Sequence, residues 1–227
     1  MAVTPESLTV REKAYYYVKD LILSDRLQSG QRLNQESIAK KLQISRTPIR
    51  EALHRLRSEG LIEMSETGGF RVCRLSLEEL EELFDIRSRL EGYLIRSACK
   101  NIPEDEIKRL SRYIRNSEKA VVAENSDDIF KWNTKFHDLL QQYAKDKQRT
   151  NNIIANMKEH MLRYRKNTLY YLDAAERSIV AHKKVLFALQ LRDADLCEYL
   201  IQKHIQESKE DAIRITFNNH KNLIKTE

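Results

Sequence analysis

The feature that most limits the fold of this chain is the distribution of its glycines and prolines. There are five glycines, at positions 30, 60, 68, 69 and 92, and three prolines, at positions 5, 48 and 103. After Gly92, Pro103 is therefore the only residue of either kind as far as residue 227. Tight turns between strands depend on these residues, so this long segment is predicted to form long helices joined by polar turns.

The first third of the chain has a different pattern. Three segments carry apolar residues at helical spacing, and two shorter segments alternate polar and apolar residues around a glycine-bearing turn. Three helices followed by a two-stranded hairpin is the arrangement of a winged helix-turn-helix, in which the helix before the hairpin is the candidate recognition helix. The expected helices cover residues 8–28, 35–42 and 46–59, and the expected strands cover 61–64 and 70–75.

We therefore expect a mainly α-helical chain of two domains. Residues 1–75 would form the winged helix-turn-helix, and residues 76–227 an all-helical bundle. Ser76 is a suitable N-cap for the first helix of the bundle, as are Asp173 and Asp193 for two later helices. The later helices are expected at residues 103–124, 126–145, 147–171, 173–192 and 193–219.

The charge is uneven along the chain. The net charge is +6, and residues 1–75 hold 13 Lys and Arg against 9 Asp and Glu. This excess in one third of the chain favours an acidic partner such as DNA. The three cysteines are widely spaced without a C-x-x-C pattern, which favours free thiols in a reducing compartment. With no apolar run of about 18 residues, we expect a cytoplasmic protein with no membrane partner.

The segment 46–59 predicts a helix with two distinct faces. Arginine at its N-terminal end suits base contacts, because a guanidinium can bond guanine O6 and N7 together. A solvated basic face would show the same residues, but the nearby Gly68-Gly69 pair would let a wing tip approach DNA closely. The apolar face comprises Ile49, Ala52, Leu53 and Leu56, and the polar face includes Arg46, Thr47, Arg50 and His54.

Three of the six histidines lie on three separate expected helices. His137 stands four residues after Asn133, so the two share a helix face, and His182 and His204 follow on later helices. Imidazoles that point inward from three helices can bind a divalent metal inside a bundle. A lone histidine is more often an ordinary polar residue, so the spacing alone leaves both interpretations open.

Two stretches resemble a known family. RLNQESIAKKLQISRTPIREALHRLRSEGLIE resembles the DNA-binding domain of GntR-type bacterial transcription regulators, and SRTPIREAL with L-x-x-EGL is the most specific part. From LEELEELFDIRSRLEG onward, the chain looks like the all-helical FCD effector domain of the FadR-like branch. The resemblance implies a homodimeric repressor or activator that binds an inverted-repeat operator and responds to a small metabolite such as a carboxylic acid. Of the two roles, we expect a repressor.

The resemblance also implies which residues contact DNA. Ser45, Arg46, Thr47 and Arg50 match the contacting residues of the recognition helix, and Thr67 and Gly68 match the wing tip. One departure is Glu36, which stands where many relatives place an arginine against phosphate. That phosphate contact would then be lost or would pass to Lys40 or Lys41.

In the second domain the resemblance implies a metal site. Many FCD domains hold zinc or nickel with an Asp-x-x-x-His pair and two later histidines, and here Asn133, His137, His182 and His204 align with that set. Asn133 replaces the common aspartate, which removes a charge and should weaken the binding of hard cations. Arg87 matches a recurrent arginine and would pair with an effector carboxylate, or else with Glu91 at i+4.

Two other classes of protein remain as alternatives. An open metal on three histidines can activate water, as in a metal-dependent enzyme. However, no H-E-x-x-H motif supplies a base, and an enzyme would leave the basic winged helix without a role, so we expect no enzymatic activity. A DNA binder with a non-functional effector pocket would bind DNA with strong salt dependence and little sequence preference.

Overall fold

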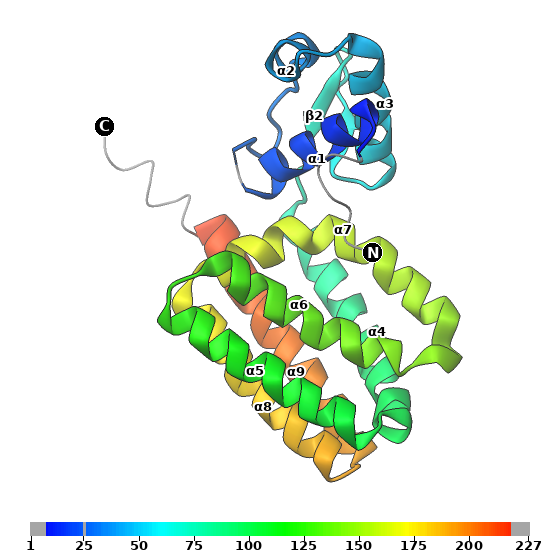
Figure 1. Ribbon diagram of the computed structural model, residues 1–227, viewed down its shortest axis with the longest axis vertical. Helices are drawn as coiled ribbons and strands as arrows, with labels where there is room; N and C mark the ends of the chain where they lie inside the picture. Colours follow the sequence, from blue (N-terminus) through cyan, green and yellow to red (C-terminus); the bar gives the residue numbers. More distant parts are fainter. Residues whose placement is uncertain (1–7, 25, 219–227) are drawn as a thin grey trace. The chain divides into compact units, whose positions relative to one another are not determined.

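In the computed structural model, which describes residues 8–24 and 26–218, the chain is mostly helical and divides into two units (Figure 1). The first unit is Met1–Leu75 and the second is Ser76–Glu227. Within the described residues, no helix is long and apolar enough to cross a membrane.

The described part of the first unit holds three helices followed by a two-stranded antiparallel sheet, which is the winged helix-turn-helix arrangement predicted from the sequence. The strands pair in the register Ile62↔Val72, Glu63↔Arg71 and Met64↔Phe70. The elements are α1 (Val10–Leu23), α2 (Gln35–Leu42), α3 (Arg46–Ser58), β1 (Ile62–Met64) and β2 (Phe70–Val72).

Local sequence explains where these helices begin and end. Asn34 caps α2, because its side chain accepts a hydrogen bond of 3.0 Å from the Ser37 N–H. Helix α1 was expected to reach residue 28 but ends at Leu23, where the N–H and the hydroxyl of Ser24 both donate to the Asp20 carbonyl. The predicted apolar stripe of α3 is buried in the core of this unit, as Ile49, Ala52, Leu53 and Leu56.

The second unit is helical throughout its described residues (Figure 1). Helix α9 packs along α4 and also against α8, while α5 packs against α6 and α8. The elements are α4 (Leu77–Asn101), α5 (Glu104–Val122), α6 (Ser126–Gln142), a short 3-10 turn (Lys145–Lys147), α7 (Gln148–Leu169), α8 (Leu172–Gln190), α9 (Ala194–Ile213) and a π-helical turn (Arg214–Asn218).

Of the three N-caps expected in this unit, two are confirmed and one is wrong. Ser76 begins α4 with a capping box to Glu79, and Asp193 caps α9 by accepting from the Leu196 N–H at 2.9 Å. Asp173 does not cap α8, because the helix begins at Leu172 and Tyr171 occupies the N-cap position. Asp173 lies in the first turn instead, where its charge still favours the positive end of the helix dipole.

The inner face of α4 is unusually polar for a core helix. Arg87, Ser88 and Glu91 are all at least nine-tenths buried, among apolar neighbours such as Phe84 and Leu94. Buried charges require partners, because an isolated ion in a low-dielectric interior is strongly disfavoured. This face therefore marks where the second unit holds its polar site.

Candidate functional site

The polar face of α3 is open to solvent. Ser45 occupies the N-cap position, but its hydroxyl does not cap the helix. Together with Ser45, the residues Arg46, Thr47 and Arg50 are exposed at the N-terminal end of α3, opposite the buried stripe. This surface has the residue types and the placement that major-groove contacts require, and the contacts themselves stay a prediction.

Arg46 has a partner that the sequence did not reveal. Its Nη2 lies 2.9 Å from Oε1 of Glu36 on α2, and both side chains are largely exposed. An exposed ion pair contributes about 0–1 kcal/mol, so a guanine or a phosphate can displace it. Glu36 therefore does more than omit a phosphate contact, since it also neutralises one of the arginines expected to bind DNA.

The hairpin tip is held in a defined conformation. The Ser65 N–H donates to the Gly69 carbonyl and the Gly68 N–H to the Ser65 carbonyl, each at 2.9 Å. Gly68 and Gly69 have φ values of +80° and +85°, which side chains rarely adopt, so glycine is needed here. Thr67 and Gly68 are exposed, as a wing tip must be. Arg32, which sequence reasoning missed, donates from Nη2 to the Gly68 carbonyl at 2.7 Å.

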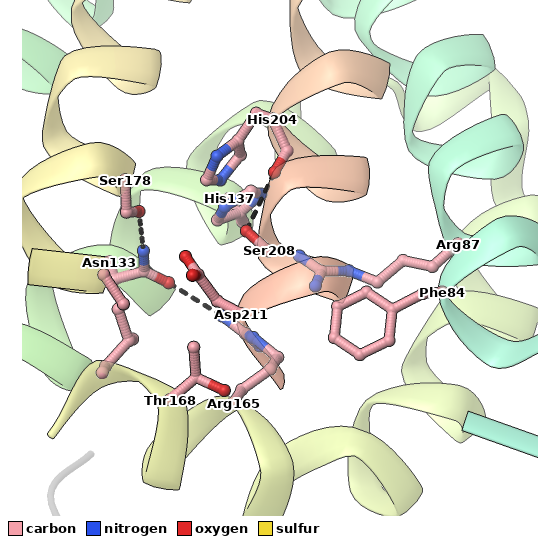
Figure 2. A pocket seen from close by; sticks show the side chains of 12 residues that line it. Phe84, Arg87, Asn133, His137, Arg165, Thr168, Ser178, His204, Ser208 and Asp211 are labelled. Carbon is pink, nitrogen blue, oxygen red and sulfur yellow. Dashed lines mark hydrogen bonds between the residues drawn. The ribbon is translucent and has the colours of Figure 1, made fainter. Parts of the chain in front are cut away.

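In the second unit, three buried histidines come together from three helices. His137 on α6, His182 on α8 and His204 on α9 are each no more than 4% exposed. A ligating nitrogen from each lies within 4.8 Å of the other two. The ring of Phe136 stacks on His182 with centroids 4.0 Å apart and fixes its orientation. His137 and His204 line the cavity that Figure 2 shows from close by.

The geometry of the three histidines fits a metal ion. The Nε2 atoms of His137 and His182 are 3.2 Å apart. Two nitrogens bound at about 2.0–2.1 Å to a tetrahedral zinc would lie roughly 3.3 Å apart. The donor set suits zinc or nickel, because imidazole nitrogen favours these ions over magnesium. That these residues ligate an ion stays a prediction.

A carboxylate orients the first of these histidines. Oε2 of Glu91 lies 2.8 Å from Nδ1 of His137, while its Oε1 lies 2.6 Å from Nε of Arg87. An ionised Glu91 accepts a hydrogen bond from the Nδ1–H of His137, which leaves the Nε2 lone pair facing His182. A carboxylate–histidine pair of this kind is the usual support for a metal ligand. The sequence predicts Glu91 only as a partner of Arg87, so its contact with His137 is a finding of the structure.

The protonation states agree with this arrangement. Burial raises the pKa of Glu91, but Arg87 and His137 outweigh burial and hold that pKa well below its ordinary value. Burial lowers the pKa of His137, which Glu91 partly opposes. Burial also takes the pKa of His182 and of His204 well below the ordinary value. At neutral pH the three imidazoles are therefore uncharged and can offer lone pairs.

Asn133 lies next to the histidines but is engaged within the protein. Its Oδ1 accepts a hydrogen bond of 3.0 Å from Nη2 of Arg165, and its Nδ2 donates to Oγ of Ser178 at 2.8 Å. Both ends of the amide are thus occupied, so Oδ1 would have to leave Arg165 in order to bind a metal. Sequence reasoning singled out neither Arg165 nor Ser178.

A small cavity adjoins this cluster (Figure 2). Its water-accessible volume is about 30 Å³, which is room for one or two water-sized groups. Arg87 lines it, as predicted for an effector contact, but its Nε is bonded to Glu91, as the alternative interpretation proposed. The other polar lining residues are Asn133, His137, Arg165, Thr168, Ser178, His204, Ser208 and Asp211.

Of the other histidines, the structure describes the side chain of His54, which takes no part in this cluster. His54 lies on the exposed side of α3 with its ring edge-on to Phe70, the centroids 5.3 Å apart. The side chain of His160 and the whole of His220 lie outside the described residues.

An exposed basic helix with a glycine-tipped wing, followed by a helical bundle with a buried polar site, is the arrangement of a DNA-binding transcription regulator. Comparison with known proteins identifies its family. Residues 10–72 match the family described as bacterial regulatory proteins, gntR family, and residues 82–207 match the FCD domain. The chain belongs to the GntR family of regulators with an FCD domain, and it is a DNA-binding regulator rather than an enzyme.

Individual relatives agree with this assignment. The chain is 29% identical to the HTH-type transcriptional regulator YdhC of Bacillus subtilis over 65% of its own length and 64% of that protein's. It is 28% identical to the transcriptional repressor RspR of Escherichia coli over 92% of both chains. The solved structure of E. coli McbR/YncC has the same fold, with a TM-score of 0.73 and 22% identity over 91% of this chain and 98% of that one.

Proposed function

We propose that this chain is a homodimeric transcriptional repressor whose binding to an inverted-repeat operator is controlled by a small carboxylate. Residues 1–75 act as the DNA-binding domain, and residues 76–227 act as the ligand-binding and dimerisation domain. The repressor assignment is supported by the similarity to RspR, which is named as a repressor. Effector control is supported by a buried polar cavity beside three converging histidines.

In this proposal, each recognition helix enters the major groove at one half-site. Arg46 and Arg50 contact base edges, while Ser45 and Thr47 bond to the backbone or to neighbouring bases. Thr67 and Gly68 bring the wing tip to an adjacent groove or phosphate. The exposure of all these residues supports this assignment.

His137, His182 and His204 hold a divalent metal, zinc or nickel, with Asn133 as a further ligand once its amide oxygen leaves Arg165. When bound, the ion supplies positive charge and open coordination positions for effector oxygens. Arg87 adds a second contact to the effector through its terminal nitrogens, since Nε is committed to Glu91. The convergence of three neutral imidazoles within 4.8 Å is the observation that carries this proposal.

Effector binding changes the packing of the helical domains and, through it, the separation of the two recognition helices. An inverted repeat is bound tightly only when that separation matches the spacing of the half-sites. Losing one half-site should cost several kcal/mol, within the gap of roughly 4–10 kcal/mol between specific and non-specific binding.

Metal content per chain tests the metal site. It is measured by mass spectrometry on protein purified without chelator, beside a His182→Ala, His204→Ala double variant and a His54→Ala control. About one metal ion per wild-type chain and per control chain, lost in the double variant, is the expected result. Equal metal in all three, or none in the wild type, would rule out a site on these histidines.

Operator binding tests effector control. The operator is first selected from random DNA, and its affinity is then measured by fluorescence anisotropy across a panel of small carboxylic acids. At least one acid should weaken operator binding without being consumed. If the chain binds random DNA as well as the selected site and no acid changes the affinity, it is a DNA binder with a non-functional pocket.

A further inference from the structure

Arg165 on α7 is a buried cation whose hydrogen-bond partner is a neutral amide. Its side chain is 7% exposed, and its Nη2 donates to Oδ1 of Asn133 at 3.0 Å. Among the residues that the structure describes, no carboxylate forms an ion pair with it. Burial and the charge of Arg87 lower the pKa of Arg165 to about 10, which still leaves the guanidinium charged at neutral pH.

The carboxylates around Arg165 are all bonded to other groups. A buried arginine without a counter-ion is strongly disfavoured unless something else supplies the negative charge. The three histidines are neutral and add none. The engaged carboxylates are Glu91, with Arg87 and His137; Asp138, with Lys158; and Asp211, with Arg177 and Arg214. The cluster therefore lacks one negative charge at Arg165.

Two separate cavities border this side chain. Arg165 and Arg87 line the polar cavity of about 30 Å³ and also a second one of about 10 Å³. The second cavity is lined by as many cationic as apolar side chains: Arg87, Lys158 and Arg165, with Ile154, Met157 and Met161. Figure 2 shows the guanidinium of Arg165 directed toward Asn133 at the edge of the polar cavity. The guanidinium of Arg165 therefore borders a polar space that a small anion can enter.

We propose that Arg165 is the anchor of the effector, and that the effector is a small monocarboxylate. Its carboxylate pairs with the guanidinium in the polar cavity. One negative charge matches the one uncompensated positive charge, and the small volume of this cavity restricts the ligand to a few carbon atoms. The regulatory meaning of this site rests on the proposed function, whereas the binding itself does not.

The same contact suggests how binding is transmitted. Arg165, Asn133 and Ser178 form a hydrogen-bonded chain that joins α7, α6 and α8. A carboxylate is a stronger acceptor for a guanidinium than an amide oxygen is. When the carboxylate takes Arg165, the link from α7 to α6 is released, and Oδ1 of Asn133 becomes available to another partner. The effector thus acts on the position of α7 relative to the other two helices.

The test is calorimetric titration of the full chain with acetate, propionate and butyrate, with succinate and phosphate for comparison. Each titration is run with and without EDTA, and Tm is followed in parallel. The three monocarboxylates should bind more tightly than succinate or phosphate in both conditions. In Arg165→Met their affinity should fall about tenfold or more, while the Tm of the ligand-free variant should not fall, because an unpaired buried charge has been removed.

Three further variants make the result specific. Arg165→Lys keeps the charge and should retain part of the affinity. Asn133→Asp supplies an internal carboxylate to Arg165, so in EDTA it should weaken monocarboxylate binding without unfolding the chain. Arg112→Met removes an exposed arginine and should change nothing.

Undiminished monocarboxylate binding in Arg165→Met would overturn the proposal. So would wild-type binding that disappears in EDTA, because the anchor would then be the metal. If wild-type monocarboxylate binding depends on Arg165 but no acid alters operator affinity, the anchor stands and effector control fails. If an acid alters operator affinity equally in Arg165→Met, effector control stands and the anchor fails.

Discussion

Replacing Glu91 by glutamine should weaken metal binding and destabilise the second unit at the same time. The glutamine oxygen can still accept from Nε of Arg87, so the shape of the site is kept. Its amide nitrogen, however, takes the place of Oε2, which lies 2.8 Å from Nδ1 of His137. Because that nitrogen is a donor, His137 must accept at Nδ1 and carry its proton on Nε2. The lone pair that faces His182 is then lost.

The magnitudes follow from two effects. Loss of a supporting carboxylate behind a ligating histidine typically weakens metal affinity about 10–100-fold, or roughly 1.4–2.7 kcal/mol. Arg87 and Glu91 are each 6% exposed, with Nε and Oε1 2.6 Å apart. Breaking a buried pair by removing one partner costs about 3–5 kcal/mol. The hydrogen bond kept by glutamine places the expected loss of unfolding free energy near the lower limit, about 3 kcal/mol.

Zinc affinity is measured by competition calorimetry, and the unfolding free energy by urea titration in EDTA. Glu118→Gln is the matched control, because Glu118 is a partly exposed carboxylate on α5 that pairs with Lys183. The control should lose no more than about 1 kcal/mol and should keep its zinc affinity. Wild-type zinc affinity in Glu91→Gln would refute the role assigned to this carboxylate, whatever the change in stability.

Three further outcomes are expected in the first unit. Arg50→Ala should cost about 1–3 kcal/mol on the operator and relax its sequence preference; an equal loss on random DNA, by anisotropy, would make Arg50 a phosphate contact. Glu36→Gln should strengthen binding to the operator and to random DNA alike, because it frees Arg46 and removes a negative charge. Weaker operator binding would mean that Glu36 orients Arg46. Burial raises the pKa of Glu59, but Tyr15 and two basic neighbours outweigh burial and lower it. Its stabilising contribution is therefore present above its ordinary pKa of 4.5 and lost as pH falls through the folded value, so acid should reduce the stability of Glu59→Gln less than that of the wild type, by circular dichroism.

Much of the fold was predictable because its signals are local. The buried stripe of α3 follows from helical spacing, and the Asn34, Ser76 and Asp193 caps follow from residue types that accept hydrogen bonds from the next turn. The errors are also local. Residue patterns did not indicate that α1 would end at Leu23, or that Tyr171 would occupy the cap position expected of Asp173.

The candidate site was only partly predictable. Motif resemblance named the three histidines, and the structure places their side chains together from three helices. The sequence did not reveal the two charged groups beside those histidines, Glu91 as a partner of His137 and Arg165 as a buried cation. Glu91 was considered as a partner for Arg87 but not for His137, and Arg165 is one of several basic residues in KEHMLRYRKN with nothing to distinguish it.

The sequence by itself determined that this chain has a winged-helix domain and an all-helical domain, since periodicity, caps and contiguous motifs depend on neighbours in the chain. Only the tertiary structure decided that Glu36 neutralises Arg46 and that Arg165 is buried beside Asn133 without a carboxylate. The reason is physical. Burial, and the charges that act on a group, depend on helices that meet across long separations in sequence, and residue spacing carries no record of those encounters.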